Sequence, residues 1–384
     1  MTKIEAQKIQ YTSSGELKEP LKTNNSQSDN SIFEDYDTTE NDSFEQYVQI
    51  SSKPENTPAT TANKPKVADI IKQDYTSKLQ ESIDERYNQI QQSNGQLTPE
   101  SSELTEDQER WAKYVEMYGA KEDAASQKKA KLFSSMIPDS GNGKIDKPAK
   151  QISNNCWLIG GINSLAITET GEKLLENNLH KDNEKHMISV HLKEAENNHM
   201  PQPKGDGIYT FTEKEIFDAQ KRGDKDGLVS GDGDVTAYAL AIEEYLKEKN
   251  NGELPAGKSH FSDGAPVARL YEIVTGQSRS DANSGITFTQ INEKNNSNET
   301  ISKYFENIQN INQNKSGATS LNIYGHAFCV VGTDKDNLLI QESNLTEILK
   351  DKLELVPNSF PPTYKLPMDK FGSTVESFSN ITWE

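Results

Sequence analysis

Cysteine is scarce in this sequence: it occurs twice in 384 residues, as Cys156 and Cys329. A disulfide in a secreted protein and a pair of buried apolar thiols are the two structural explanations for such residues. One disulfide is an unusual framework for so long a chain, and two cysteines with scattered histidines form no zinc-binding pattern. We therefore expect a protein made in a reducing cytoplasm, whatever its destination.

Long hydrophobic runs are also missing. No segment has the length and apolarity of a transmembrane helix, and the polar N-terminal region lacks the apolar core of a signal peptide. We expect no membrane span, and a cytoplasmic location or export by a route that needs no cleaved leader. The sequence also lacks a Gly-x-Ser-x-Gly elbow, a His-Glu-x-x-His motif, a Walker loop and a dinucleotide fingerprint, which argues against the enzyme classes that use them.

Positive charge is in short supply, because 41 Lys and Arg residues stand against 60 Asp and Glu residues, for a formal net charge of −19. A nucleic-acid partner requires a basic face that neutralises phosphates. The short basic run over residues 128–131 is typical of a helix surface instead. The composition therefore argues against nucleic-acid binding.

The apolar fraction of 32% is low, and the deficit is greatest in residues 1–65. This segment is rich in Ser, Asn, Thr, Glu and Asp and cannot bury enough apolar surface to offset the entropy of ordering it, so we predict a disordered leader. Apolar residues at helical spacing predict helices over 66–96 and 105–135. Residues 66–137 are interpreted as a helical extension whose role is open: an interaction arm, a regulatory segment, a pro-region or a packing extension of the core.

Residues 138–384 carry mixed helix and strand signals and are interpreted as one domain. Helices are expected from Cys156, over 172–179, after the Thr212–Glu215 capping box, after a cap at Asp234 and over 265–275. Strands are expected over 187–192, 208–212, 320–323, 327–331, 338–341 and 381–383, with a hairpin turn at 334–337. Helices dominate the half that carries Cys156 and strands dominate the half that carries His326. We therefore expect an α+β fold with a site between two lobes.

Cys156 lies where a helix is predicted to begin, after a loop over 138–148. Asn154 and Asn155 are good capping residues, so Cys156 falls in the first turn, where the helix dipole and free N–H groups stabilise a thiolate. Two glycines, residues 160 and 161, follow in the same helix, although each costs about 1 kcal/mol relative to Ala. That cost indicates that another element approaches the helix closely. We predict that Cys156 is a nucleophile rather than a buried apolar thiol.

A histidine at the start of an apolar strand provides a partner for this thiol. In residues 325–332, Gly-His-Ala-Phe-Cys-Val-Val-Gly, strand alternation puts His326 on one face and Cys329 on the other. Cys329 is therefore predicted to be a core thiol. His326 is predicted to be the general acid and base that lowers the pKa of the Cys156 thiol further. The other five histidines lie in polar surroundings and are assigned no role.

Two further roles have candidates. A third group should hold the imidazole through its other nitrogen, and the strand after that of His326 offers Glu342 as the first choice and Asn344 as the second. Antiparallel pairing across the short turn brings the end of that strand near the start of the histidine strand. For the developing oxyanion, Gln151 lies just upstream of the nucleophile, and the backbone N–H of Cys156 is the other donor.

These motifs carry a resemblance. Residues 156–165, Cys-Trp-Leu-Ile-Gly-Gly-Ile-Asn-Ser-Leu, resemble the nucleophile helix of papain-like cysteine proteases, specifically the Cys-Trp-Leu helix of the calpain family. Residues 325–332 are similar to the calpain histidine strand, and residues 231–245 resemble the helix between the two motifs in bacterial calpain-like proteins. The resemblance covers about residues 145–384 and implies a two-lobed papain-like core, a cysteine endopeptidase activity and a protein or peptide substrate.

Two positions depart from the family pattern. The family's third residue is an Asn in an Asn-Pro-Trp-type motif, and Glu342 stands at the equivalent position without Pro or Trp after it. A carboxylate still orients His326 and stabilises its charged form more strongly. The family's oxyanion Gln lies one residue further upstream than Gln151 does, so another donor, such as Asn154, is an alternative. The roles of Cys156 and His326 carry over, and the other two stay open.

Calpains also imply calcium. The acidic run over residues 224–234 resembles an EF-hand loop, but Val235 stands where that loop needs a Glu ligand. No cofactor is therefore assigned, and calcium dependence is left open by the family resemblance. The alternative function is a catalytically inactive papain-fold interaction module, or a different thiol acyltransferase of the transglutaminase kind.

Overall fold

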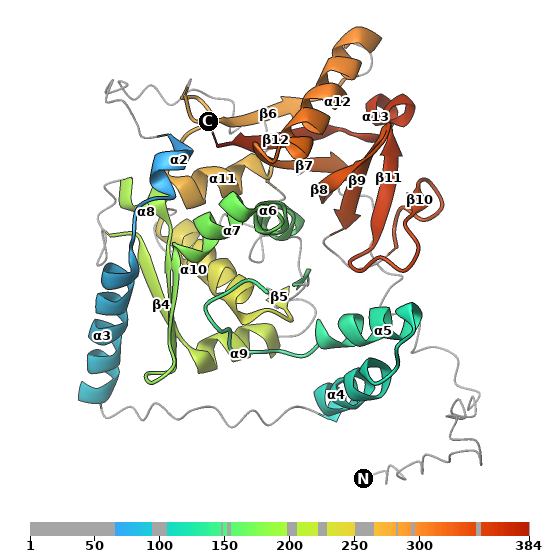
Figure 1. Cartoon of the computed structure of the whole chain (residues 1–384). Helices are drawn as coiled ribbons and strands as arrows, with labels where there is room; N and C mark the ends of the chain where they lie inside the picture. Colours follow the sequence, from blue (N-terminus) through green and yellow to red (C-terminus); the bar gives the residue numbers. More distant parts are fainter. Residues whose placement is uncertain are drawn as a thin grey trace, which may run out of the picture. The chain divides into compact units, whose positions relative to one another are not determined.

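A seven-stranded antiparallel sheet, drawn in orange and red in Figure 1, dominates the C-terminal part of the computed structural model. Its strand order is β10-β11-β9-β8-β7-β12-β6. The strands are β6 Ile286–Gln290, β7 Gly317–Ile323, β8 His326–Asp334, β9 Asn337–Glu342, β10 Glu354–Leu355, β11 Thr363–Pro367 and β12 Ser377–Thr382. The turn between β7 and β8 has positive φ at both central residues, Tyr324 (52°) and Gly325 (75°). This is the geometry of a tight type I′ hairpin, and it makes His326 the first residue of β8.

Two smaller sheets lie in the N-terminal half. One has the antiparallel order β2-β3-β4, and the other pairs β1 with β5. Their strands are β1 Lys150–Gln151, β2 Leu179–Asp182, β3 Met187–His191, β4 Ile208–Thr212 and β5 Val229–Ser230. All five residues of β3 are buried, as expected for the central strand of a covered sheet. The strands β3, β4, β7, β8, β9 and β12 correspond to those predicted from the sequence.

Helices cover these sheets in the residues that the structure describes, which are 66–93, 106–146, 149–151, 155–197, 206–221, 229–249, 265–281, 283–292, 296–342 and 347–383. They are α2 Val67–Ile70, α3 Thr76–Gln92, α4 Glu106–Gly119, α5 Ala124–Ser134, α6 Cys156–Ala166, α7 Glu169–Glu176, α8 Lys193–Asn197, α9 Glu213–Lys221, α10 Gly233–Lys249, α11 Ala268–Thr275, α12 Asn298–Gln313 and α13 Met368–Thr374. The predicted leader, residues 1–65, lies outside these ranges. None of the described helices is both long and apolar enough to cross a membrane.

The large sheet separates two hydrophobic cores. On one face, Ala327 and Ile381 pack with α6, α10 and α11 in the larger core. On the other face, Phe328 and Val330 pack with α12 and α13 in the smaller core. Figure 1 shows α12 and α13 on the opposite side of the sheet from α6 and α11. The α+β class with antiparallel sheets is confirmed.

Helices α2 and α3 pack on this domain. Val67 and Ile70 of α2 belong to the same hydrophobic core as Cys156. α3 lies against β2, β3 and β4, with Leu79 and Ile83 only 1% and 0% exposed. A buried hydrogen bond of 2.7 Å joins the hydroxyls of Ser82 and Thr210 across this contact. A helix with buried apolar and polar contacts to a sheet is an integral part of that layer.

Two helices predicted as continuous are each split in the structure. The first forms α2 and α3, because the carboxylate of Asp74 accepts a hydrogen bond of 2.9 Å from the N–H of Thr76 and starts a new helix there. The second forms α4 and α5, because Asp123 accepts an equivalent bond of 2.9 Å from the N–H of Ser126. Short polar side chains that bind backbone N–H groups favour a helix start over a helix interior.

The start of α7 also differs from the prediction. Thr168 caps the helix by accepting a hydrogen bond of 3.0 Å from the N–H of Gly171. The helix was predicted to begin at residue 172, but it begins at Glu169, so residues 170–171 lie inside it. Gly171 serves a close approach instead, since a Cβ there would lie 2.4 Å from the carbonyl oxygen of Leu165 at the end of α6.

Asp234, predicted to cap α10, has another role. Asp232 caps this helix, accepting hydrogen bonds from the N–H groups of Asp234 (2.9 Å) and Val235 (3.1 Å). The carboxylate of Asp234 instead accepts bonds of 2.8 and 2.9 Å from the N–H groups of Asn142 and Gly143. Burial raises the pKa of Asp234 to about 6, against the lowering effect of these two N–H groups. This contact fixes the loop that precedes the Cys156 helix.

Candidate active site

Cys156 is the first residue of α6, as predicted. The preceding Asn155 occupies the cap position, but its side chain forms no capping hydrogen bond; its carbonyl accepts from the N–H groups of Leu158 and Ile159. The N–H groups of Cys156 and Trp157 lie beside the sulfur, where they act to lower the pKa of the thiol. The thiol itself is buried, with 9% of the residue exposed. The helix start therefore presents backbone donors to a thiol that is largely withdrawn from solvent.

The two helix glycines allow close approach, which confirms the expectation from the sequence. A Cβ on Gly160 would lie 2.9 Å from the Cβ of Ala327 on β8, closer than real Cβ atoms come. A Cβ on Gly161 would lie 2.4 Å from Cδ2 of Leu270 on α11. Gly160 thus lets β8 lie against α6, and Gly161 does the same for α11.

The sulfur of Cys156 lies beside the backbone on both sides of His326. Its Sγ atom is 3.9 Å from the carbonyl oxygen of Gly325, within reach of a weak S–H hydrogen bond. The N–H of Ala327 also lies at the sulfur and acts to lower the pKa of the thiol. The helix start and the residue before the strand, which are 169 positions apart in the sequence, therefore meet at Cys156.

His326 shares a sheet face with Phe328, opposite to Ala327. The half-buried imidazole loses hydration, and this loss lowers the pKa of His326. Its Nδ1 atom is buried and has no hydrogen-bond partner among the described residues. His326 thus begins a row of side chains on the face away from α6, at the end of the strand that the sulfur contacts.

Glu342 lies on the same face as His326, because it pairs with Phe328 across β8 and β9. The carboxylate is 1% exposed and lies 3.4 Å from the N–H of Ile348 and 3.5 Å from the hydroxyl of Tyr364, both of which can donate to it. It forms no hydrogen bond with Nδ1 of His326. The structure therefore brings the predicted third residue to the right face of the sheet without the predicted bond.

The other predicted site residues fare differently. Gln151 is buried on β1, where it pairs with Val229 of β5, and it does not line the pocket at Cys156. Asn154 and Asn344 lie outside the described residues. Cys329 is a core thiol, as predicted: it is 1% exposed, burial raises its pKa to about 12, and neither cysteine forms a disulfide.

A pocket lies beside the sulfur. It has a volume of about 30 Å³, room for one or two water molecules. Its described lining is Cys156, Ala265, Pro266, Val267, Ser320, Leu321, Asn322, Gly325, Ala327, Ser377, Phe378 and Ser379. Among the described residues, no group of three or more His, Cys, Asp or Glu side chains could hold a metal ion.

Sequence reasoning missed Glu376, which borders this pocket. Its carboxylate accepts hydrogen bonds from the side chain of Asn322 (2.8 Å) and from the N–H of Gly325 (3.2 Å). The carboxylate thus holds the hairpin turn that precedes His326. An exposed Glu more than fifty positions away from that turn gives no signal in the sequence.

No known protein-family model and no curated protein matches the chain.

The thiol of the unliganded protein is expected to react slowly near neutral pH. Burial raises the pKa of Cys156 more than the three nearby N–H groups lower it, so the structure favours the thiol where the sequence predicted a thiolate. Alkylation by iodoacetamide should therefore keep rising above about pH 9. Mass spectrometry of the Cys156 peptide over a pH series measures this rate. A plateau reached below about pH 7 would contradict the expectation.

Proposed function

We propose that this protein is a cysteine endopeptidase with a papain-like, calpain-like core. The observation that carries the proposal is the contact of Cys156 with the backbone that flanks His326. Strand and helix approach so closely that only glycine fits at position 160. Such a constraint is expected where a helix-borne nucleophile and a strand-borne base have to be kept in register. The resemblance to calpains supports the proposal too, because it implies a helical lobe that carries the Cys and an antiparallel lobe that carries the His.

The proposed reaction starts from a neutral pair. Since burial raises the pKa of Cys156 and lowers that of His326, the thiol and the imidazole are both uncharged near neutral pH. His326 takes the thiol proton as Cys156 attacks the scissile carbonyl, and it then gives that proton to the leaving amine. Water resolves the thioester by the reverse proton path. His326 lies on the face of the sheet away from α6, so for the first step its imidazole has to turn around the end of β8 to reach the sulfur. The first residue of a strand can make this turn.

Two supporting roles belong to the same proposal. The N–H of Cys156 points at the sulfur and is a donor for the oxyanion that forms next to it. Glu342 takes the role of the third residue once substrate binding turns the imidazole so that Nδ1 faces the carboxylate. From the sequence, Gln151 was the side-chain donor for the oxyanion with Asn154 as its alternative, and Asn344 was the second choice for the third residue. No cofactor enters this mechanism, and a calcium requirement is tested by assaying with and without a chelator.

Replacing Cys156 by Ala tests the proposal. The variant should lose peptide cleavage and covalent labelling by a thiol-directed peptidyl epoxide, because the attacking sulfur is gone. Circular dichroism and thermal unfolding should remain close to those of the original protein. A matched Cys329→Ala variant should keep both activities, since Cys329 is a core thiol on β8. Undiminished cleavage by Cys156→Ala would reject the assignment.

A second candidate function is a papain-fold domain that binds a partner without cleaving it. Two observations favour it: Nδ1 of His326 has no hydrogen-bond partner among the described residues, and burial raises the pKa of Cys156. A thiol acyltransferase uses the same sulfur and differs in its acceptor, an amine in place of water. Incubation with peptides and a dansylated amine separates the three: free acid, amine conjugate, or unchanged peptide.

A further inference from the structure

The pocket at Cys156 exists because three neighbouring strands present small side chains on one face. Ala327 of β8 pairs with Asn322 of β7, and Asn322 pairs with Ser377 of β12. This row runs across the sheet next to the sulfur. A large apolar residue at any of these positions would fill the hollow.

A second row closes the floor. Ser320 of β7 pairs with Ser379 of β12, and both are buried. Their hydroxyls are already engaged: Ser320 donates to the carbonyl of Phe328 at 2.8 Å, and Ser379 accepts from the N–H of Ala268 at 3.0 Å. Hydroxyls with partners need no polar ligand, so the floor of the pocket suits a side chain without strong hydrogen-bonding groups.

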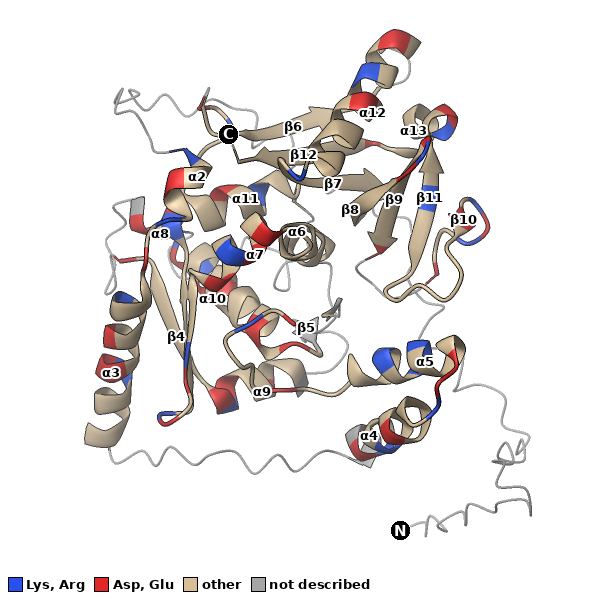
Figure 2. Cartoon of the chain, in the orientation of Figure 1, with Lys and Arg blue, Asp and Glu red and all other residues tan. Residues whose placement is uncertain are grey.

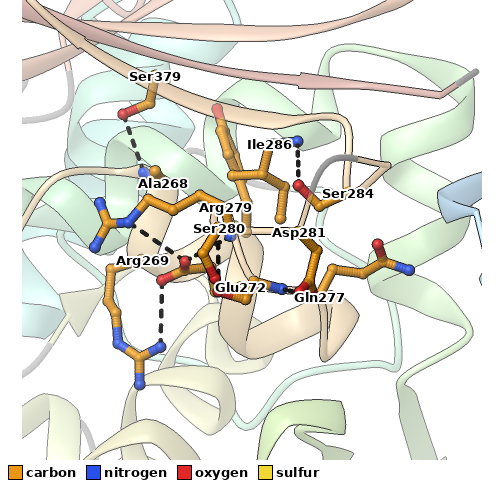
Figure 3. Close-up of polar contacts among 12 residues, drawn as sticks. Ala268, Arg269, Glu272, Gln277, Arg279, Ser280, Asp281, Ser284, Ile286 and Ser379 are labelled. Carbon is orange, nitrogen blue, oxygen red and sulfur yellow. Dashed lines mark hydrogen bonds and ion pairs between the residues drawn. The ribbon is translucent and has the colours of Figure 1, made fainter. Parts of the chain in front are cut away.

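The opposite wall is the start of α11, where Pro266 and Val267 face the sheet. Figure 3 shows how this helix is held. Ser379 binds its first N–H, and Glu272 accepts from the N–H of Arg279 at 2.9 Å and contacts Arg269 at 3.5 Å. The contacts of Glu272 lie within α11 and the segment that follows it, whereas the bond from Ala268 to Ser379 joins the helix to β12. That bond ties this wall of the pocket to the sheet.

The lining carries no charge. None of the described lining residues is Asp, Glu, Lys or Arg, and Figure 2 shows β7 and β12 free of charged residues. Glu376 lies at the rim of the pocket, where its carboxylate binds Asn322 and Gly325. A charged side chain that entered would lose its hydration without a partner. A carboxylate would also meet the charge of Glu376.

We propose that this pocket binds one side chain of the substrate beside the scissile bond and selects small apolar residues, Ala or Val. The inference rests on the proposed function, because Cys156 lines the pocket and any chain attacked by its sulfur passes over it. Aromatic rings are much larger than the one or two water molecules for which the pocket has room. The occupant is a peptide side chain near the acyl group that the sulfur attacks.

A positional peptide mixture tests the selectivity with the full chain. Peptides that carry Ala or Val at one position near the cleaved bond should be cut at least about 10-fold faster than those with Phe, Lys or Glu there, since one misfitting group in a pocket is worth about 10–200-fold. Cleavage sites and rates come from mass spectrometry. Equal rates for Val and Phe at every position, or a preference for a charged residue, would overturn the inference.

Two variants tie the selectivity to this pocket. Ser377→Leu should fill it and lower cleavage of the best peptide at least about 10-fold, whereas Val267→Ala should widen it and raise the relative rate for Leu at least about 5-fold. Ser373→Leu, on the exposed surface of α13, makes the same chemical change away from the pocket and should alter neither. Selectivity that is unchanged in both pocket variants would refute the assignment.

A measurement without turnover separates this inference from the proposed function. Methyl methanethiosulfonate transfers its methylthio group to the sulfur of Cys156, and the rate is followed on the Cys156 peptide. N-acetyl valine methylamide should slow this reaction, and the phenylalanine, lysine and glutamate analogues should not. Protection by the valine analogue without peptide cleavage would reject the protease function and support the selectivity of the pocket. Equal protection by all four analogues, or protection by none, would reject the selectivity of the pocket even if cleavage occurs.

Discussion

Replacement of His326 by Ala is expected to lower kcat/KM for peptide cleavage by about 10³-fold. Without the imidazole, the buried thiol has no base to accept its proton, and burial raises the pKa of that thiol, so water alone ionises it poorly. The loss should appear mainly in kcat, because the imidazole is not among the residues that line the pocket. Steady-state kinetics on one cleavable peptide measure it.

The pH profile gives this prediction a sharper form. Burial lowers the pKa of His326, so the imidazole stays neutral and active as a base to below about pH 6.5, and kcat/KM should fall only under that value. This acid limb should vanish in His326→Ala. His186→Ala, which removes a half-buried histidine paired with Glu213 at 2.9 Å, is the control and should keep both rate and limb. An equal loss in both variants would refute the role of His326.

Substitution of Gly160 by Ala is expected to reduce both stability and activity. The added methyl would lie 2.9 Å from the Cβ of Ala327, so α6 and β8 have to separate. Overpacking of this kind costs about 1–3 kcal/mol of unfolding free energy, which exceeds the gain of about 1 kcal/mol from replacing a helical glycine. A displacement of roughly 1 Å at the nucleophile should lower kcat/KM by about 10²-fold. Urea unfolding and peptide cleavage measure the two effects.

A second substitution tests the cause. Ala327→Gly in the Gly160→Ala background removes the opposing methyl and should restore most of the lost stability and activity, at the cost of about 0.5–1 kcal/mol for a glycine in a strand. Gly161→Ala provides the control, because its methyl meets the end of the flexible Leu270 side chain on another helix. Ala327→Gly should not improve that variant. Failure to rescue Gly160→Ala, or equal rescue of both, would contradict the proposed contact.

Local signals in the sequence predicted the elements near the site well. The α6 start at Cys156, the strand β4 and the capping box of α9 follow from side chains that act on their own neighbours. In that box, Thr212 and Glu215 bind each other's backbone N–H groups at 3.1 and 2.7 Å. Such bonds depend only on residues three positions apart, so a single sequence reveals them.

Elements were not predicted where two secondary-structure signals in the sequence compete. α12 carries Phe305, Ile308 and Ile311 on its buried side and a cap at Ser297, yet it lies in a region dominated by strands and was not predicted. The break between α2 and α3 depends on one short side chain, Asp74, inside an otherwise helical pattern. Periodicity averages over such single-residue stops.

For the site, the residues were easier to predict than their electrostatics. Helix capping and strand alternation are local, so Cys156 and His326 could be found from the sequence. Gly160 in the helix also correctly predicted the close approach of another element. Burial is not local: it depends on β8, α11 and the surrounding core, and it reversed the expected direction of the pKa of Cys156. The hold of Glu376 on the hairpin turn also comes only from the folded sheet.

The packing of α3 limits where this chain can be cut. A recombinant fragment that started at the loop before α6 would strip the outer layer from β2, β3 and β4, expose apolar strand surface and leave the hydroxyl of Thr210 without its Ser82 partner. We expect such a fragment to aggregate. If processing removes a segment to activate the proposed protease, α3 has to stay attached.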